Sequence, residues 1–379
     1  MGTITAGHYP PPAIPPAPPV THLRYLDGLR AAAALFVVLH HAWLEAGLAY
    51  NVFGHYAVGL FIVLSGFCLM LPVIRGGGTL PGGSLHFFRK RARRILPPYY
   101  AALALSVVLA GTVLYGHGEP ISRAGLVTHA FLVHNLSAGT ALQFNGPLWS
   151  VAVECHIYLL FPLLVWVFRR VGPVAATAAI VAFSFLLARL LFRLPVNTDM
   201  HGASPQFLGL FAFGMLAARV SLAPTARLAR FRATFPWKAA VTGSTVLLLL
   251  PAWQWYGQYQ FHYLVDYLVG GWGFAVLVCI HCRRPAWLYD LLSWRPLVLV
   301  GTFAYSIYLV HLPVLQLLRV YGSGTLGLQG PGLLALLAGA GVPLVIGVGY
   351  LFYRCFERPF QRQGAKTAYQ RKIPAGAVV

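Results

Sequence analysis

Long apolar runs recur along the chain from about residue 31 to the C-terminal tail, separated by short polar or basic segments. Each run is close to 20 residues long, the length that a helix needs to cross the hydrocarbon core of a bilayer. A helix also satisfies its own backbone hydrogen bonds in lipid. We therefore predict an all-α polytopic integral membrane protein with about ten transmembrane helices, at roughly residues 27–48, 55–74, 97–116, 146–168, 172–192, 205–220, 238–256, 262–281, 296–318 and 331–354.

Basic residues are distributed very unequally between the two sides of these runs. If the N-terminus is cytoplasmic, nearly all of the 28 Lys and Arg residues fall in cytoplasmic segments. The exceptions are Arg123, Arg189, Arg193 and Arg319. Because cytoplasmic loops of membrane proteins collect Lys and Arg, both termini are predicted to be cytoplasmic, and the protein to be a multi-pass protein of the cell membrane.

The composition supports this membrane assignment. Hydrophobic residues make up 58% of the chain and charged residues only 9%, whereas a soluble domain carries about 25% charged residues. A net charge of +20 would suggest nucleic-acid binding in a soluble protein, but membrane topology accounts for it here, so the expected partner is the lipid bilayer. We expect a Pro-rich cytoplasmic arm at 1–22 with no cleavable signal peptide, a membrane domain at 23–362 and a basic cytoplasmic tail at 363–379.

Five cysteines are too few, and odd in number, for a disulfide framework. Cys279 and Cys282 form a CxxC at a predicted helix end. Without a second pair, two reduced structural thiols are a better interpretation than a metal site. We therefore predict no metal site and no permanently bound cofactor.

Ionisable groups inside apolar runs are candidates for function, because burying them in lipid is costly. Arg30 and His41 lie eleven residues apart in the first run, so they point from one helix face, separated by roughly 16 Å along the axis. His40 is rotated about 100° from His41. A single His in a helix is often only a packing residue. Its depth in the membrane, compared with that of other ionisable groups, therefore has to decide between packing and function.

Two further groups are predicted at a similar depth. Glu154 lies about 10 Å below the outer surface in the fourth run, and His311 lies about 22 Å from the inner face in the ninth. Three ionisable side chains from three helices at one level indicate a site. We expect Glu154 to lie beside His41.

A dense group of cations follows the second run, in the predicted cytoplasmic loop HFFRKRARRILPPYY. One interpretation is contact with anionic lipid headgroups. The other is a phosphate clamp for a cytosolic donor, since Arg has the fork geometry for phosphate. Pro97 and Pro98 are expected at the start of the third helix, where Pro is tolerated.

Small residues in the second run, Gly59, Ser65 and Gly66, have two interpretations. They can permit close helix approach, or they can let a ligand chain pass. Helix packing is the more favoured of the two.

At these positions the chain resembles the membrane acyltransferase family three. The resemblance rests on segments that follow in the family's order over residues 24–362: LDGLR with ten residues between Arg30 and His41, GLFIVLSGF at 59–67, RARRILPPY at 91–99, WSVAVECHIYLLFP at 149–162, YSIYLVHLPV at 305–314 and FERPF at 356–360.

The resemblance implies transfer of an acyl group, usually acetyl, from cytosolic acyl-CoA to a hydroxyl of a surface glycan or a glycosylated natural product such as a macrolide. Arg30 and His41 match the family's Arg-x10-His motif, Arg91 and Arg94 its RxxR motif, and Glu154 its acid position. Supporting roles are expected for Asp27, His40, Ser65, Trp149, Ser150, Tyr158 and His311. The chain departs from the family at Cys155, where a second acid is frequent, and at His40, where an aromatic residue is common.

Three functions are compared for a membrane protein with these residues. In an O-acyltransferase using acetyl-CoA as co-substrate, His41 would remove the proton of a carbohydrate or glycoside hydroxyl and Glu154 would orient the imidazole, with an acyl-histidine intermediate as an alternative route. A transporter or flippase would use His and Glu as a proton relay, but no inverted repeat or pair of broken helices is predicted. A scaffold subunit would not need His41 and Glu154. The acceptor and the oligomeric state, homo-oligomer included, stay open.

Overall fold

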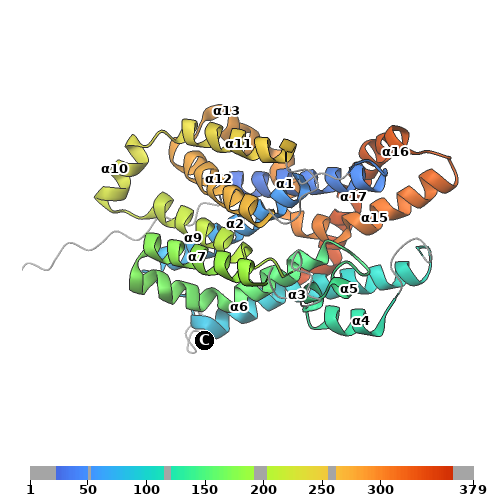
Figure 1. Ribbon diagram of the computed structural model, residues 1–379, viewed down its shortest axis with the longest axis horizontal. Coiled ribbons are helices and arrows are strands. Elements are labelled where there is room, and N and C mark those ends of the chain that lie inside the picture. The colour runs from blue at the N-terminus through green and yellow to red at the C-terminus, as the bar shows by residue number, and fades with distance from the viewer. Residues whose placement is uncertain (1–22, 50–52, 115–120, 192–202, 255–261, 362–379) are drawn as a thin grey trace, which may run out of the picture.

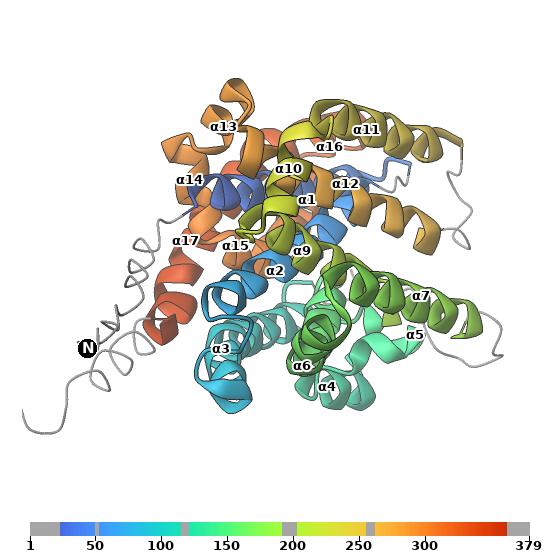
Figure 2. The same cartoon turned by 90° about the vertical axis from the view of Figure 1, so that its left-hand side faces the viewer.

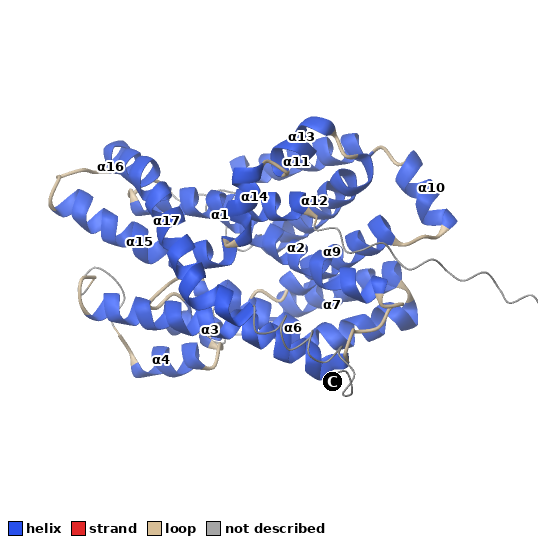
Figure 3. Cartoon of the chain, turned by 180° about the vertical axis from the view of Figure 1, so that it is seen from behind, coloured by secondary structure: helices blue, strands red, loops and turns tan. Residues whose placement is uncertain are grey.

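The computed structural model describes residues 23–49, 53–114, 121–191, 203–254 and 262–361, and these ranges contain helices and loops with no strand (Figures 1 and 3). The all-α prediction is therefore confirmed. The predicted arm at 1–22 and basic tail at 363–379 lie outside these ranges.

A helix lies at each predicted membrane span. The bounds are α1 (Arg24–Glu45), α2 (Phe53–Arg75), α3 (Gly83–Gly111), α6 (Leu148–Val171), α7 (Pro173–Leu191), α9 (Phe207–Leu222), α11 (Trp237–Gln254), α12 (His262–Arg283), α15 (Ala304–Gly324) and α17 (Val342–Phe352).

Within the described ranges, six helices are long and apolar enough to cross a membrane, or eight if each of two bent helix pairs counts as one span. The chain is therefore a multi-pass membrane protein. The count of ten and the cytoplasmic termini stay predictions.

Two helix pairs are broken, contrary to the sequence prediction. Helix α9 bends by 101° into the basic helix α10 (Ala226–Thr234). The ninth predicted span consists of α14 (Arg295–Thr302) and α15, bent by 76° around Phe303. The absence of broken helices therefore no longer argues against a transporter.

The basic segment after α2 is helical, which corrects its assignment to a loop. Helix α3 begins at Gly83, after Gly82 with φ of +76°, and Leu, Arg, Lys and Ala in its first turns are good helix formers. Pro97 and Pro98 therefore lie inside the helix. A neighbouring helix contributes to the backbone bonding there, since the Tyr305 hydroxyl donates to the Ile95 carbonyl at 3.3 Å.

Helices α2 and α9 lie at the centre of the molecule, between α3, α6 and α7 on one side and α1, α11 and α12 on the other (Figures 1 and 2). Close approach depends on glycine: a Cβ on Gly66 would lie 2.1 Å from the Phe211 carbonyl oxygen, and one on Gly214 1.9 Å from that of Val63. Packing is thus the role of Gly66, as favoured from the sequence.

Short elements complete the two ends of the bundle. Helix α4 (Arg123–Ala130), η1 (His134–Leu136), α5 (Ala138–Ala141) and α16 (Gly330–Leu336) lie at the end opposite to α10 (Figure 1). Helix α13 (Ala286–Leu292) precedes α14, and two π-helical segments, η3 (Leu337–Gly341) and η4 (Tyr353–Glu357), flank α17.

Candidate active site

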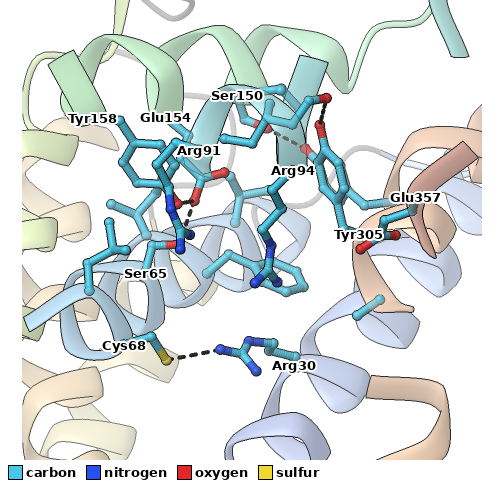
Figure 4. Close-up of a pocket in the computed structure, with 18 of the residues that line it drawn as sticks. Arg30, Ser65, Cys68, Arg91, Arg94, Ser150, Glu154, Tyr158, Tyr305 and Glu357 are labelled. Carbon is cyan, nitrogen blue, oxygen red and sulfur yellow. Dashed lines mark hydrogen bonds between the residues drawn. The ribbon is translucent and has the colours of Figure 1, made fainter. Parts of the chain in front are cut away.

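A cavity of about 240 Å³ lies between α1, α2, α3, α6, α15 and η4 (Figure 4). Its lining includes many residues that the sequence singled out: Arg30, Ser65, Arg91, Arg94, Ser150, Glu154 and Tyr158. Asp27, His40, His41, Trp149 and His311 lie outside this lining.

The cavity has a charged end and an apolar end. Along α2 its lining runs from Val58 to Leu69, about 16 Å of helix. Cys68 contacts Arg30, which marks the Leu69 end as the charged one. Near Val58, the lining is formed by Phe61, Val151, Ser150 and Tyr308. In the predicted topology the charged end faces the cytoplasm.

Arg30 is held in place by two neighbours. Its Nη1 lies 2.5 Å from the Asp27 carboxylate, one turn earlier in α1, and its Nη2 lies 3.0 Å from Cys68 Sγ. The Asp27 carboxylate and the Cys68 thiol therefore both contact the Arg30 guanidinium. The guanidinium is positioned rather than freely mobile.

Glu357 is a cavity residue to which sequence analysis gave no role, although FERPF was part of the resemblance. It is 1% exposed and accepts hydrogen bonds from Ser306 at 2.6 Å and Gln361 at 2.8 Å. It interacts electrostatically with Arg94, and the two side chains face the same cavity (Figure 4). Glu357 therefore adds a buried carboxylate to the cavity that Arg94 also lines.

Glu154 lies among hydroxyl groups and an arginine. Its Oε1 accepts hydrogen bonds from Ser65 at 2.5 Å and from Tyr158, one turn later in α6. Arg91 interacts electrostatically with it and lies beside it in Figure 4. Ser65 and Tyr158 thus support Glu154, and all three side chains line the same wall of the cavity.

His41 pairs with His311. The His41 Nδ1 lies 3.3 Å from His311 Nε2 and 3.0 Å from the Val37 carbonyl oxygen, and the ring centroids are 4.9 Å apart. Within the described residues, no hydrogen bond or ion pair joins Glu154 to either imidazole. The expected Glu154–His41 contact is thus replaced by a His41–His311 contact.

The hydrogen bonds around this pair fix which nitrogens carry protons. His311 Nδ1 lies 2.7 Å from the Tyr308 carbonyl oxygen, so in a neutral ring Nδ1 carries the hydrogen and Nε2 is an acceptor. His41 Nδ1 faces two acceptors and is therefore the donor nitrogen. This assignment leaves His41 Nε2 as the basic nitrogen of the pair.

Tyr308 connects the cavity to the imidazole pair, and sequence analysis did not single it out. Its ring lies 5.5 Å from that of His311. Its hydroxyl lies 2.6 Å from Ser150 Oγ and donates to the Pro147 carbonyl at 3.1 Å. His40 takes a different position, with its ring edge-on to His41 and close to Gly54 of α2.

Trp149 stacks on His55, which itself pairs with Asp266. Neither His55 nor Asp266 was predicted from the sequence as a site residue. Asp266 could have been selected from the sequence, because it is an acidic residue inside the apolar run of α12 and burying it in lipid is costly.

Comparison with known proteins decides the family. A family model described as "Acyltransferase domain" (acyltransferase family 3) matches residues 23–373. The chain belongs to acyltransferase family 3. The family resemblance inferred from LDGLR, RARR and FERPF is thereby confirmed.

Curated proteins similar to this chain are named as bacterial O-acetyltransferases. The Bacillus subtilis protein YrhL, whose assignment as a peptidoglycan O-acetyltransferase is itself provisional, is 28% identical over 78% of this chain and 49% of its own length. The peptidoglycan O-acetyltransferase OatA of Listeria monocytogenes is 25% identical over 77% and 49%, and the O-acetyltransferase OatA of Staphylococcus aureus 24% identical over 79% and 52%.

The chain spans about half the length of these relatives. No solved structure matches it. Family membership and the apolar helices together assign the protein to the cell membrane as a multi-pass protein.

Proposed function

We propose that this protein transfers an acetyl group from acetyl-CoA to a hydroxyl of a carbohydrate acceptor. The observation that carries the proposal is one cavity with arginines at one end and, beyond Tyr308 at the other, a paired imidazole. The names of the O-acetyltransferase relatives support the reaction class and suggest a glycan of the peptidoglycan type as acceptor.

The donor's phosphates would bind at the charged end. Arg30, Arg91 and Arg94 all line it, and guanidinium groups bind phosphate through charge-assisted hydrogen bonds. Glu154 and Glu357 would keep Arg91 and Arg94 oriented without neutralising the whole group. The acyl end of the donor would then extend toward Ser150 and Tyr308.

His41 would act as the general base. Its Nε2 takes the proton of the acceptor hydroxyl while the hydroxyl oxygen attacks the thioester carbonyl. The carbon–oxygen bond forms, the carbon–sulfur bond breaks, and the proton passes to the departing CoA thiolate. His311 would stabilise the transient imidazolium by accepting a hydrogen bond from His41 Nδ1.

The direct test is an assay of the purified protein with acetyl-CoA and a soluble N-acetylglucosamine oligomer as acceptor. We expect equal amounts of free CoA thiol and acetylated sugar. His41→Ala should lower kcat by about 100- to 10,000-fold, whereas His40→Ala should retain most activity. A wild-type protein that consumes no acetyl-CoA would contradict the proposal and leave a transporter as the alternative.

A further inference from the structure

A second polar cluster lies outside the cavity lining, beside its apolar end. Asp266 lies in the apolar run of α12 and is 0% exposed. Its Oδ1 lies 2.8 Å from His55 Nε2, and its Oδ2 accepts a hydrogen bond from Gln206 Nε2 at 2.9 Å. A carboxylate in a membrane-spanning helix is costly, and both of its oxygens are engaged here. The arrangement therefore holds His55 in one orientation.

The His55 ring extends an aromatic surface. It lies nearly parallel to Trp149, at 12° and 6.1 Å between centroids, and Phe207 packs against both rings at 5.5 and 5.7 Å. The His55 side chain is 20% exposed and Trp149 is half-buried, whereas Asp266 is fully buried. A ligand could therefore reach His55 and Trp149 but not the carboxylate.

The cluster adjoins the apolar end of the cavity. His55 precedes the cavity residue Val58 by one helical turn, and Trp149 precedes the cavity residue Ser150 directly. Arg30 and the other arginines lie at the opposite end. In the predicted topology, α2, α6, α9 and α12 all begin on the outer side, so the cluster faces the compartment from which an external acceptor would come.

A purely structural role explains these features less well. A buried ion pair adds little net stability compared with apolar side chains of similar size. Packing alone does not require an imidazole held by a carboxylate and an amide beside an accessible indole. Such a combination suits a sugar, because an aromatic face covers its apolar C–H surface and an oriented polar group binds a hydroxyl.

We propose that His55 and Trp149 bind the sugar of the acceptor, and that Asp266 and Gln206 position His55 for this contact. This inference rests on the proposed function, because it names the acceptor site of the same reaction. It assigns recognition of a carbohydrate to one end of the cavity and recognition of the donor's phosphates to the other.

The test measures acceptor and donor kinetics separately. In Asp266→Asn and His55→Gln, the KM for the N-acetylglucosamine oligomer should rise by about 10-fold or more, as expected for losing a hydrogen bond to a charged group. The KM for acetyl-CoA and the slow hydrolysis of acetyl-CoA without acceptor should stay within about twofold. A merely structural role would not separate these quantities.

A matched control is available at a different contact of α12, the one between Ser184 of α7 and Tyr267. Ser184→Ala removes a buried hydrogen bond to Tyr267, the neighbour of Asp266, and should leave both KM values unchanged. Trp149→Leu removes the indole of the aromatic surface but leaves His55 and Asp266 in place. It should raise the acceptor KM as well and serves if the charged-pair variants fail to fold.

Two results would overturn the inference. One is wild-type transfer with an acceptor KM that does not change in Asp266→Asn and Trp149→Leu. The other is an equal rise of donor and acceptor KM, which would indicate general damage. Absence of any transfer by the wild type is distinguishable, because it would refute the proposed function itself.

Discussion

Among the described residues, no carboxylate hydrogen-bonds to the His41 imidazole, which is unusual for the general base that we propose. Its Nδ1 faces the Val37 carbonyl and His311 Nε2 instead. Both neighbours are neutral acceptors that orient the ring by hydrogen bonding and can stabilise a developing positive charge on it. In the proposed mechanism, the catalytic unit at the residue scale is therefore the pair rather than one histidine.

Replacing His311 tests this pairing. His311→Phe keeps ring volume but removes the acceptor nitrogen, so kcat should fall by about 10- to 100-fold while the KM for acetyl-CoA is unchanged. His311→Asn, which can still accept a hydrogen bond, should recover part of the loss. The measurement is steady-state kinetics at several pH values, and a donor KM that rises with kcat unchanged would place His311 in donor binding instead.

The RARR segment offers an internal control for phosphate binding. Arg91 and Arg94 line the cavity, whereas Arg93 on the same helical turn is exposed and does not. Arg91→Ala with Arg94→Ala should weaken CoA binding by about 100-fold or more, from charge-assisted bonds of about 1.5–3 kcal/mol each. Arg93→Ala should change the Kd for CoA, measured by calorimetry, less than threefold. Equal effects of all three would instead indicate a general surface-charge attraction.

At the scale of elements, local sequence was enough to place the helices but not their ends or bends. Apolar runs predicted helices at every span because run length is a local property. The basic start of α3 was assigned to a loop because charge outweighed the helix propensity of its Arg, Lys, Ala and Leu residues. The break at Phe303 was not predicted, since it depends on how α14 packs against α1.

That contact makes Gly301 sensitive to substitution. A Cβ there would lie 1.9 Å from the Asp27 carbonyl oxygen, beside the residue that holds Arg30. Gly301→Ala should therefore destabilise the protein by about 1–3 kcal/mol through overpacking, and should also raise the donor KM. Gly271→Ala is the control, because its Cβ would meet nothing within 4 Å. Equal melting temperatures for the two variants would show that α1 and α14 can separate freely.

The segment with α4 and η1 contains a stacked histidine pair, His129 and His134, with centroids 3.7 Å apart. Burial lowers the pKa of His134 to about 3, with a further contribution from His129 and from His156 nearby, and burial also lowers the pKa of His129. The native segment therefore binds fewer protons than the unfolded one between about pH 3 and 6.5.

Stability of this segment should consequently fall as the pH drops below about 6.5, by about 2 kcal/mol at pH 5 from His134, with a loss in the same direction from His129. Hydrogen exchange of residues 121–145, corrected for intrinsic rates, should show the loss of protection. His134→Phe keeps the stacked ring and should remove much of the pH dependence. Protection that is the same at pH 7.5 and pH 5 would mean that the pair can take up a proton without opening.

At the scale of the whole molecule, the sequence predicted which residues line the cavity better than it predicted which residues contact one another. Arg30, Arg91, Arg94 and Glu154 could be selected because motifs and membrane burial identify them one by one. The partner of His41 could not, because depth estimates carry an error of about one turn and do not say which helix faces meet. His55 and Asp266 were missed for the same reason, since their pairing joins segments 211 residues apart.

The proposed donor and acceptor sites lie at opposite ends of the cavity, so the acetyl group would be transferred across the membrane. The donor would enter at the arginine end, and the acceptor would approach the His55 and Trp149 end. Sealed vesicles containing the reconstituted protein test this directly, with acetyl-CoA supplied only outside and the N-acetylglucosamine oligomer trapped inside. We expect acetylated sugar in the lumen with the wild-type protein and none with His41→Ala. Transfer that occurs only when donor and sugar share one compartment would contradict this expectation.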